Sequence, residues 1–301
     1  MATLPPLCED PKQIQQFLVE LKELEKRRRQ VMKVQSTLRG QAGSLVFRCL
    51  GGYQEPGKDK ATKKALSDRA ANVVKAINAG DKCLLKPKSK KPTKKTIKNS
   101  EQDVSAFDAC EGFVLTQYAS MMPQNKLRAY VERQSRNIVR SLPIWQHWAK
   151  DICGLGELGI AWMLANGGDA WRYPTNGKLN NRFCWGFVTD GNGGFVQQGK
   201  PEHGTPEEWI EHGFDKERKG QLKQFVIHLL WKPNRFTDYF QGKKAGMLSK
   251  LTAANPSEEE EEHKTEEQIG AEASSYARAC TVRNLICHYW RKYRRYMPKL
   301  D

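Results

Sequence analysis

Two glycines, Gly154 and Gly156, are the residues whose type and spacing point most directly to chemistry. One leucine separates them, an apolar segment over residues 145–152 precedes them, and small residues begin a second helix near Gly159. This order predicts a helix-hairpin-helix, because glycines allow turn conformations that other residues rarely adopt. The free N–H groups and positive dipole end of the second helix suit a phosphate. An ordinary glycine-capped turn between two helices fits the same spacing and stays open as an alternative.

The expected phosphate contacts come from backbone amides of this hairpin and from lysines and arginines around it or on later helices. Residues 155–158 are expected to offer their N–H groups. Such contacts position a protein on the nucleic-acid backbone and carry no base sequence information. The full set of expected binding residues is Lys150, Gly154, Leu155, Gly156, Glu157, Leu158, Lys178, Arg182, Lys219, Arg291, Arg294 and Arg295.

Few side chains are placed for catalysis. Asp169, Asp190 and His203 are the polar candidates in the central part of the chain. An acid that follows a helix, or one in an Asp-Gly turn, more often serves as a cap or a turn former. We therefore assign no catalytic residue from the sequence.

The cysteines and histidines do not form a recognisable metal motif. Cys280, Cys287 and His288 are the nearest approach to one, but their spacing fits a helix with buried faces better than a zinc site. No cofactor motif is evident, and Mg²⁺ is expected only if the protein is catalytically active.

Composition indicates a polyanionic partner. The 301 residues include 50 Lys and Arg against 34 Asp and Glu, a formal net charge of +16. A surplus of this size favours nucleic acid. No apolar run of membrane-spanning length and no signal peptide is found, so we expect a cytoplasmic, nucleoid-associated protein without a membrane partner. The eight scattered cysteines are expected to be reduced and partly buried.

The chain up to residue 142 reads as helices separated by a basic linker. A helix starts at Asp10-Pro11 and runs to about Leu38, with an apolar 3-4 spacing that allows a coiled coil, a homodimer or a helical hairpin. A second helix is expected over residues 60–77, within an N-terminal region ending at 85. Residues 86–100 form the Lys/Pro linker, with seven lysines between 86 and 98. Stalk helices over 103–122 and 125–141, separated at Pro123, make up the region 101–142.

Residues 143–301 are expected to form the helix-hairpin-helix domain. It includes a small β-hairpin from strands at 185–189 and 195–198, and a helix at 221–231. A short helix begins at Arg235, an exposed acidic insertion covers 242–275, and the last helix covers 273–297. The predicted fold class is therefore mainly α, with an N-terminal helical or coiled-coil part followed by this domain.

The segment SLPIWQHWAKDICGLGELGIAWMLANGGDAWRYPTNGKLNNRFCWGF resembles the helix-hairpin-helix domain of insertion-sequence transposases of the IS-one-ten group, a family guided by a bridge RNA. The similar features are an apolar helix, the Gly-x-Gly hairpin, a helix ending in Gly-Asp, an aromatic turn at 171–173 and a basic segment at 178–186. The similarity covers roughly residues 127–296. It implies a protein of transposition or of a mobile element that binds DNA or, as the alternative, a structured RNA.

The sequence departs from this family at the positions that would carry catalysis. Residues 1–100 lack the alternating strands and acids of a RuvC-like nuclease domain, and no serine lies between Ser141 and Ser249. Thr189 and Thr205 have no evident activating group nearby. A nucleic-acid-binding protein without strand-transfer activity is the first expectation. The alternatives are a compact active transposase or recombinase with another nucleophile, and a noncatalytic assembly protein.

Overall fold

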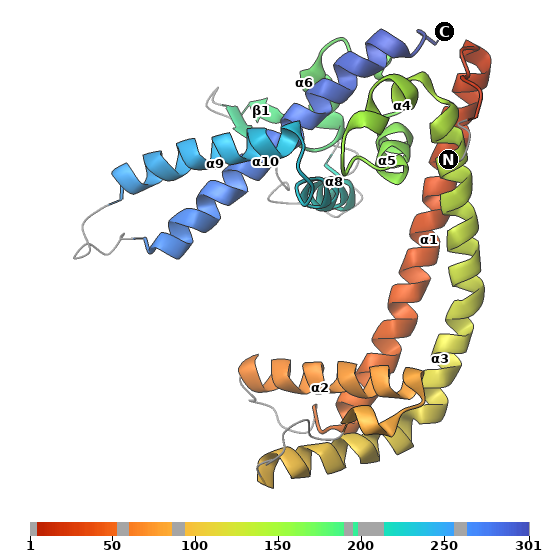
Figure 1. The fold of residues 1–301 in the computed structure, drawn as a ribbon, viewed down its shortest axis with the longest axis vertical. Helices are drawn as coiled ribbons and strands as arrows, with labels where there is room; N and C mark the ends of the chain where they lie inside the picture. The colour runs from red at the N-terminus through yellow and green to blue at the C-terminus, as the bar shows by residue number, and fades with distance from the viewer. Residues whose placement is uncertain are drawn as a thin grey trace. The chain divides into compact units, whose positions relative to one another are not determined.

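The computed structural model describes residues 5–52, 60–85, 94–189, 195–197, 214–255 and 264–300 (Figure 1). The chain divides into two compact units. The first unit comprises residues 1–25 and 132–301, and the second unit comprises residues 26–131. Helices predominate in the described parts of both, which confirms the predicted mainly α fold.

The described part of the second unit is built from three helices and one short 3₁₀ turn. They are the C-terminal part of α1 (Pro11–Cys49), α2 (Lys60–Ala79), η1 (Lys82–Leu85) and the N-terminal part of α3 (Lys94–Ser141). Apolar side chains from all of them form one core. The core residues are Ala42, Val46, Leu50, Leu66, Ala70, Val73, Ala76, Ile77, Leu85, Ala106, Phe107, Cys110 and Val114.

Helix α1 begins as predicted and ends later than predicted. The Asp10 carboxylate accepts a hydrogen bond from the Lys12 N–H at 3.1 Å, and Pro11 takes the first helical position. The helix was expected to end near Leu38 but continues to Cys49, because Ala42 and Val46 pack into the core of the second unit. The buried apolar positions of α1 therefore extend beyond residue 38.

Helix α1 packs against α3 within the second unit, in antiparallel orientation. The Gln35 Nε2 donates to Asn125 Oδ1 at 2.7 Å, and Cys49 Sγ lies 3.2 Å from Cys110 Sγ. Gln35 is only 3% exposed, so this polar side chain is buried, and it is hydrogen-bonded across the helix pair. The predicted helical hairpin is thus formed within one chain, and the homodimer stays a prediction.

Helix α3 differs from the sequence prediction at two places, the expected break at Pro123 and the expected end of the linker at residue 100. It runs unbroken through Pro123, where two separate stalk helices were expected. Proline removes one backbone hydrogen bond, but Met121 and Val131 are buried on either side, and this packing keeps the helix continuous. The helix also starts at Lys94, so residues 94–100 of the expected linker are helical. Residues 86–93 lie outside the described ranges.

The first unit is organised around α10 (Glu266–Tyr296), which contacts α4 (Pro143–His147), α6 (Asn176–Arg182), α8 (Lys216–Leu229), α9 (Arg235–Ala253) and η3 (Ala170–Arg172). A capping box starts α10: the Thr265 hydroxyl accepts from the Gln268 N–H, and the Gln268 side chain accepts from the Thr265 N–H. Ten buried residues then line the helix, including Tyr289 and Tyr293.

The hairpin segment is more irregular than two regular helices. The first predicted helix, up to Ile152, consists of α4 and the 3₁₀ turn η2 (Ala149–Asp151). Trp145 and Trp148 are 8% and 5% exposed, so both lie in the core. The second helix, α5 (Glu157–Gly167), is buried over most of its surface.

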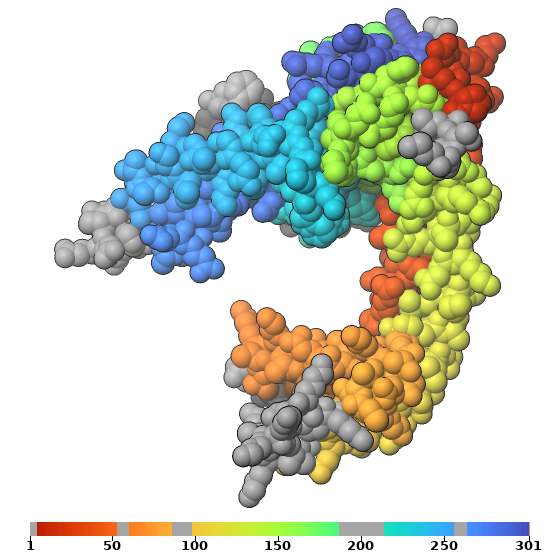
Figure 2. All heavy atoms as spheres, in the orientation of Figure 1, coloured from red at the N-terminus to blue at the C-terminus, as the bar shows by residue number. Residues whose placement is uncertain are grey.

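The last part of the chain is more helical than predicted. Residues 242–275 were expected to be an exposed excursion, yet α9 continues to Ala253 and α10 begins at Glu266. Only Phe236 of α9 is buried, so the polar composition reflects an exposed helix; Figure 2 shows α9, in light blue, at the surface of the first unit. The acidic run 258–262 lies outside the described residues.

A small antiparallel hairpin completes the first unit. Strands β1 (Phe187–Thr189) and β2 (Phe195–Gln197) pair with Val188 opposite Val196, which confirms the predicted β-hairpin. Within the described ranges, none of the helices combines the length and the apolar character needed to cross a bilayer.

Candidate nucleic-acid interface

The two glycines of the hairpin differ in what the fold requires of them. Gly154 has φ +89°, and a Cβ there would lie 3.1 Å from the Leu229 carbonyl oxygen of α8. Glycine is therefore needed at 154 for both conformation and close packing. Gly156 has φ −74° as the N-cap of α5, and a Cβ there would meet nothing within 4 Å.

Some of the amides expected to bind phosphate already have partners. The Leu155 N–H donates to the Ile152 carbonyl at 3.0 Å, and the Leu155 side chain is 2% exposed. The Glu157 carboxylate accepts from Arg140 Nε and Nη2 at 3.0 and 2.9 Å. Leu158 is half-buried. An acid therefore stands at the start of α5, where a phosphate was expected.

The Glu157 carboxylate is held in its charged form. Burial alone would raise its pKa, but the hydrogen bond from its own backbone N–H and the Arg140 guanidinium together lower the pKa below its ordinary value. A fixed negative charge at this helix end competes with any phosphate for the same helix dipole.

The remaining predicted cations near the hairpin have different surroundings. Lys150 on η2 and Lys178 on α6 are exposed. Arg182 Nε donates to the Asn166 carbonyl at 3.0 Å and so joins α6 to α5. Lys219 lies over the rings of Trp185 and Phe214, and burial lowers the pKa of Lys219. The structure therefore leaves Lys150 and Lys178 as the exposed cations of this group.

The end of α10 forms a cluster of cations and aromatic rings. The Arg294 guanidinium lies 4.5 Å from the Trp171 ring centroid and 4.8 Å from that of Trp290. Arg295 lies 5.5 Å from the ring of Tyr296, and Arg291 is exposed. Residues 273–300 contain seven Lys and Arg and no acid, so the predicted Arg291, Arg294 and Arg295 lie on a strongly basic segment.

Among the catalytic candidates, Asp169 lies in the described part of the chain and has a structural role there. Asp169 is 7% exposed and its carboxylate accepts from the Trp171 N–H, so it serves as a cap. Asp190, His203 and Thr205 lie outside the described ranges. Across the described parts of the chain, His, Cys, Asp and Glu side chains form no group of three able to hold a metal. Cys287 Sγ instead accepts from Asn176 Nδ2 at 3.1 Å.

Sequence reasoning missed how unevenly the charge is distributed. Residues 26–131, the second unit, contain 23 Lys and Arg against eight Asp and Glu, a net +15. The first unit contains 27 Lys and Arg against 26 Asp and Glu, a net +1. Almost the whole surplus therefore belongs to the second unit, whereas all twelve predicted binding residues lie in the first. A segment-by-segment charge count would have found it.

Two helices of the second unit begin with lysines. Lys60, Lys63 and Lys64 lie in the first five residues of α2 and are exposed; α3 begins at Lys94. Neither helix has an acid in its first turn. Cations at a helix N-terminus oppose the helix dipole, so they are unfavourable for the isolated helix. An anion bound there would be stabilised by both the lysines and the N–H groups.

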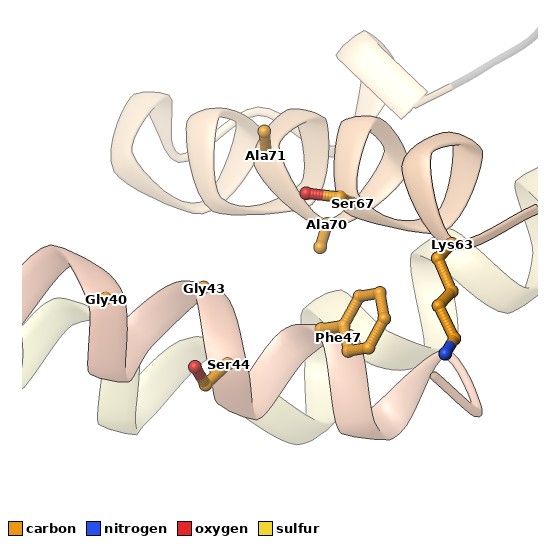
Figure 3. Close-up of a pocket in the computed structure, with 8 residues that line it drawn as sticks. All are labelled: Gly40, Gly43, Ser44, Phe47, Lys63, Ser67, Ala70 and Ala71. Atoms are coloured by element: carbon orange, nitrogen blue, oxygen red, sulfur yellow. The ribbon is translucent and has the colours of Figure 1, made fainter. Parts of the chain in front are cut away.

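A groove of about 390 Å³ lies between α1 and α2 beside these lysines. Figure 3 shows that Gly40 and Gly43 of α1 face α2 across it, with Phe47 between the helices and Lys63 at one end. A Cβ added at Gly40 or Gly43 would meet nothing within 4 Å. Ser44, Ser67, Ala70 and Ala71 complete the lining, so small and hydroxyl-bearing residues predominate.

Compared with known proteins, the chain matches no family model, no curated protein and no solved structure. The resemblance to transposases of the IS-one-ten group therefore stays a prediction from the sequence.

Proposed function

We propose that this protein binds nucleic acid, with DNA as the first candidate, mainly through phosphate contacts of the second unit. The observation that carries the proposal is the net +15 of residues 26–131. Lysines that neutralise phosphates release counterions, and this release drives binding without recognition of a base sequence. The cation–aromatic cluster at the end of α10 is proposed as a second contact, where rings such as Trp171 and Trp290 also offer stacking surface.

The groove between α1 and α2 supports a close approach of the phosphate backbone. Glycines at 40 and 43 leave the α1 surface without side chains, while the Ser44 and Ser67 hydroxyls can donate to phosphate oxygens. Lys63 supplies a positive charge at the groove. We therefore propose that the main binding surface includes the groove and the lysines at the start of α2.

The hairpin is a weaker part of this proposal. Glu157 places a negative charge at the N-terminus of α5, and Leu155 uses its amide within the turn. The resemblance to transposases supports a role in transposition or in a mobile element, with a nucleoid-associated location. It also supports a structured RNA as the alternative ligand.

Fluorescence anisotropy with a labelled DNA duplex and a labelled structured RNA tests the proposal. We expect binding whose affinity falls steeply with salt, by about a thousandfold or more from 50 to 200 mM for about six phosphate contacts. Tighter binding to the RNA at every salt concentration would identify RNA as the ligand. Binding of neither would overturn the proposal and leave the assembly function.

A pair of glycine variants tests the groove itself. Gly43→Leu should fold normally, because its Cβ points into open space, but its side chain should fill the groove and weaken binding at least severalfold. Gly112→Leu is the matched control, since Gly112 is likewise a helical glycine of the second unit with open space at its Cβ, and it lies outside the groove lining. Equal affinity of the two variants would remove the groove from the proposal.

A further inference from the structure

Two cysteines of the second unit lie in direct contact. Cys49 ends α1, Cys110 lies in α3, and their Sγ atoms are 3.2 Å apart. Cys49 is exposed, whereas Cys110 is 0% exposed and belongs to the core of the unit. Both are free thiols. One sulfur is thus open to reagents in solution, while its neighbour is shielded behind it.

The surrounding fold holds the two thiols in place for bond formation. A disulfide has an S–S length of about 2.05 Å, so the sulfurs need to approach by about 1.2 Å. They belong to antiparallel helices whose packing is fixed by neighbouring core residues such as Val46 and Val114. Other described thiols are used differently: Cys8 Sγ donates to Gln13 Oε1, and Cys184 Sγ accepts from the Asp215 N–H.

From this geometry we propose that Cys49 and Cys110 form a reversible redox site, oxidised to a disulfide by a hydroperoxide. The exposed Cys49 thiolate attacks a peroxide oxygen and the O–O bond breaks, which gives a sulfenic acid at Cys49. The alkoxide, or hydroxide from hydrogen peroxide, takes up the proton that the Cys49 thiol released and leaves as an alcohol or water. The Cys110 sulfur then attacks the Cys49 sulfur. The hydroxide of the sulfenic acid leaves, takes up the proton of the Cys110 thiol and is released as water. Overall, two thiols lose two electrons and the peroxide gains them.

The order of the two steps follows from the environments of the thiols. Burial first, and then the contact with Cys49, raise the pKa of the Cys110 thiol to about 12. Cys110 therefore stays protonated and unreactive toward peroxide, while Cys49 meets the oxidant at the surface. Cys110 acts as the resolving cysteine once Cys49 is oxidised.

Oxidation would change the second unit without changing its charge. The new bond would tie the end of α1 to α3 and close a loop that contains α2 and η1. Such a cross-link restricts the unfolded chain, so we expect a higher midpoint of thermal unfolding for the oxidised protein. The site does not depend on the proposed nucleic-acid binding.

Peptide mapping of the full-length protein tests this site. The reduced protein is treated with a small excess of hydrogen peroxide, blocked with iodoacetamide and digested with trypsin without reductant. We expect a cross-linked pair of peptides, residues 49–58 and 99–126, and a fall from eight to six titratable thiols, reversed by dithiothreitol. Oxidation of Cys49 to a sulfinic acid, with Cys110 recovered as the alkylated thiol, would overturn the proposal.

Three variants make the test specific. Cys49→Ser and Cys110→Ala should both lose the cross-link and the rise in unfolding midpoint. Cys83→Ser, which removes another exposed thiol of the second unit, should keep both. Circular dichroism confirms that the buried Cys110→Ala variant folds, and Cys49→Ser supplies the same test at an exposed position. A cross-link that persists without Cys49 would also contradict the assignment.

Discussion

Glu157 shows that a correctly predicted turn does not ensure the phosphate binding expected from it. The glycine spacing placed the turn correctly, and Gly154 needs its positive φ. Whether a phosphate can bind depends on the charge at the start of α5, and there the structure places a carboxylate paired with Arg140. This pair joins residues 17 positions apart, so it could not be read from the hairpin motif.

Removing the negative charge of Glu157 tests whether the hairpin contacts phosphate. If the hairpin contacts phosphate, Glu157→Gln should strengthen nucleic-acid binding by about two- to fivefold, the effect of one charge near a helix terminus. Anisotropy titrations at low salt measure the change. Glu132→Gln is the control, because Glu132 is also ion-paired with an arginine, Arg136, and lies outside the hairpin. An unchanged affinity for Glu157→Gln would place the hairpin outside the interface.

His288 gives a pH dependence to the folded state. Burial, and then Arg235, Arg291 and Lys292, lower the pKa of His288 from its ordinary value of 6.5. The unfolded chain therefore takes up the proton at a higher pH than the folded chain does. Stability contributed by neutral His288 should be present above about pH 6.5 and be lost as the pH falls through the folded-state pKa.

Urea titrations across this pH range measure the effect. The wild-type protein should lose stability below about pH 6.5, and His288→Gln should lose less over the same interval. An identical pH dependence of the two proteins would show that His288 is not the group responsible.

At the scale of elements, the sequence predicted the helices better than their ends. The Asp10 cap predicted the start of α1, and the expected start of the second helix at residue 60 agrees with α2. Pro123 was misleading, because a local rule breaks the helix there while packing by Met121 and Val131 keeps it whole. The start of α9 at Arg235 was predicted, but its length was underestimated for a related reason, since the helix buries only Phe236 and so lacks a clear apolar spacing.

Pro123 should therefore lower the stability of the folded protein, and substitution by alanine should restore it. Pro123→Ala restores a backbone donor inside α3 and should raise the free energy of unfolding by about 1–3 kcal/mol. Urea unfolding measures the gain. Pro143→Ala is the control, because Pro143 is at the first turn of α4, where proline is well tolerated. No gain at Pro123 would mean that the helix packing depends on the local proline geometry.

Over the whole molecule, composition predicted a polyanionic partner but not where it binds. The count of +16 was available from the start, yet its concentration in residues 26–131 becomes meaningful only once α1, α2 and α3 are known to share one core. That core joins residues far apart in the sequence, such as Val46 and Val114. No periodicity in the sequence identifies such a pairing.

The lysines of the second unit are proposed to carry the nucleic-acid binding, and the salt dependence of the affinity measures their contribution. Lys60, Lys63 and Lys64 are changed together to Gln, and the control changes Lys223, Lys232 and Lys250, three exposed lysines of the first unit. Both variants lose the same charge. The slope of log affinity against log salt should become shallower by up to about 2.7 in the first variant and stay near wild type in the control. Equal slopes for the two variants would show that the lysines at the start of α2 do not contact the nucleic acid.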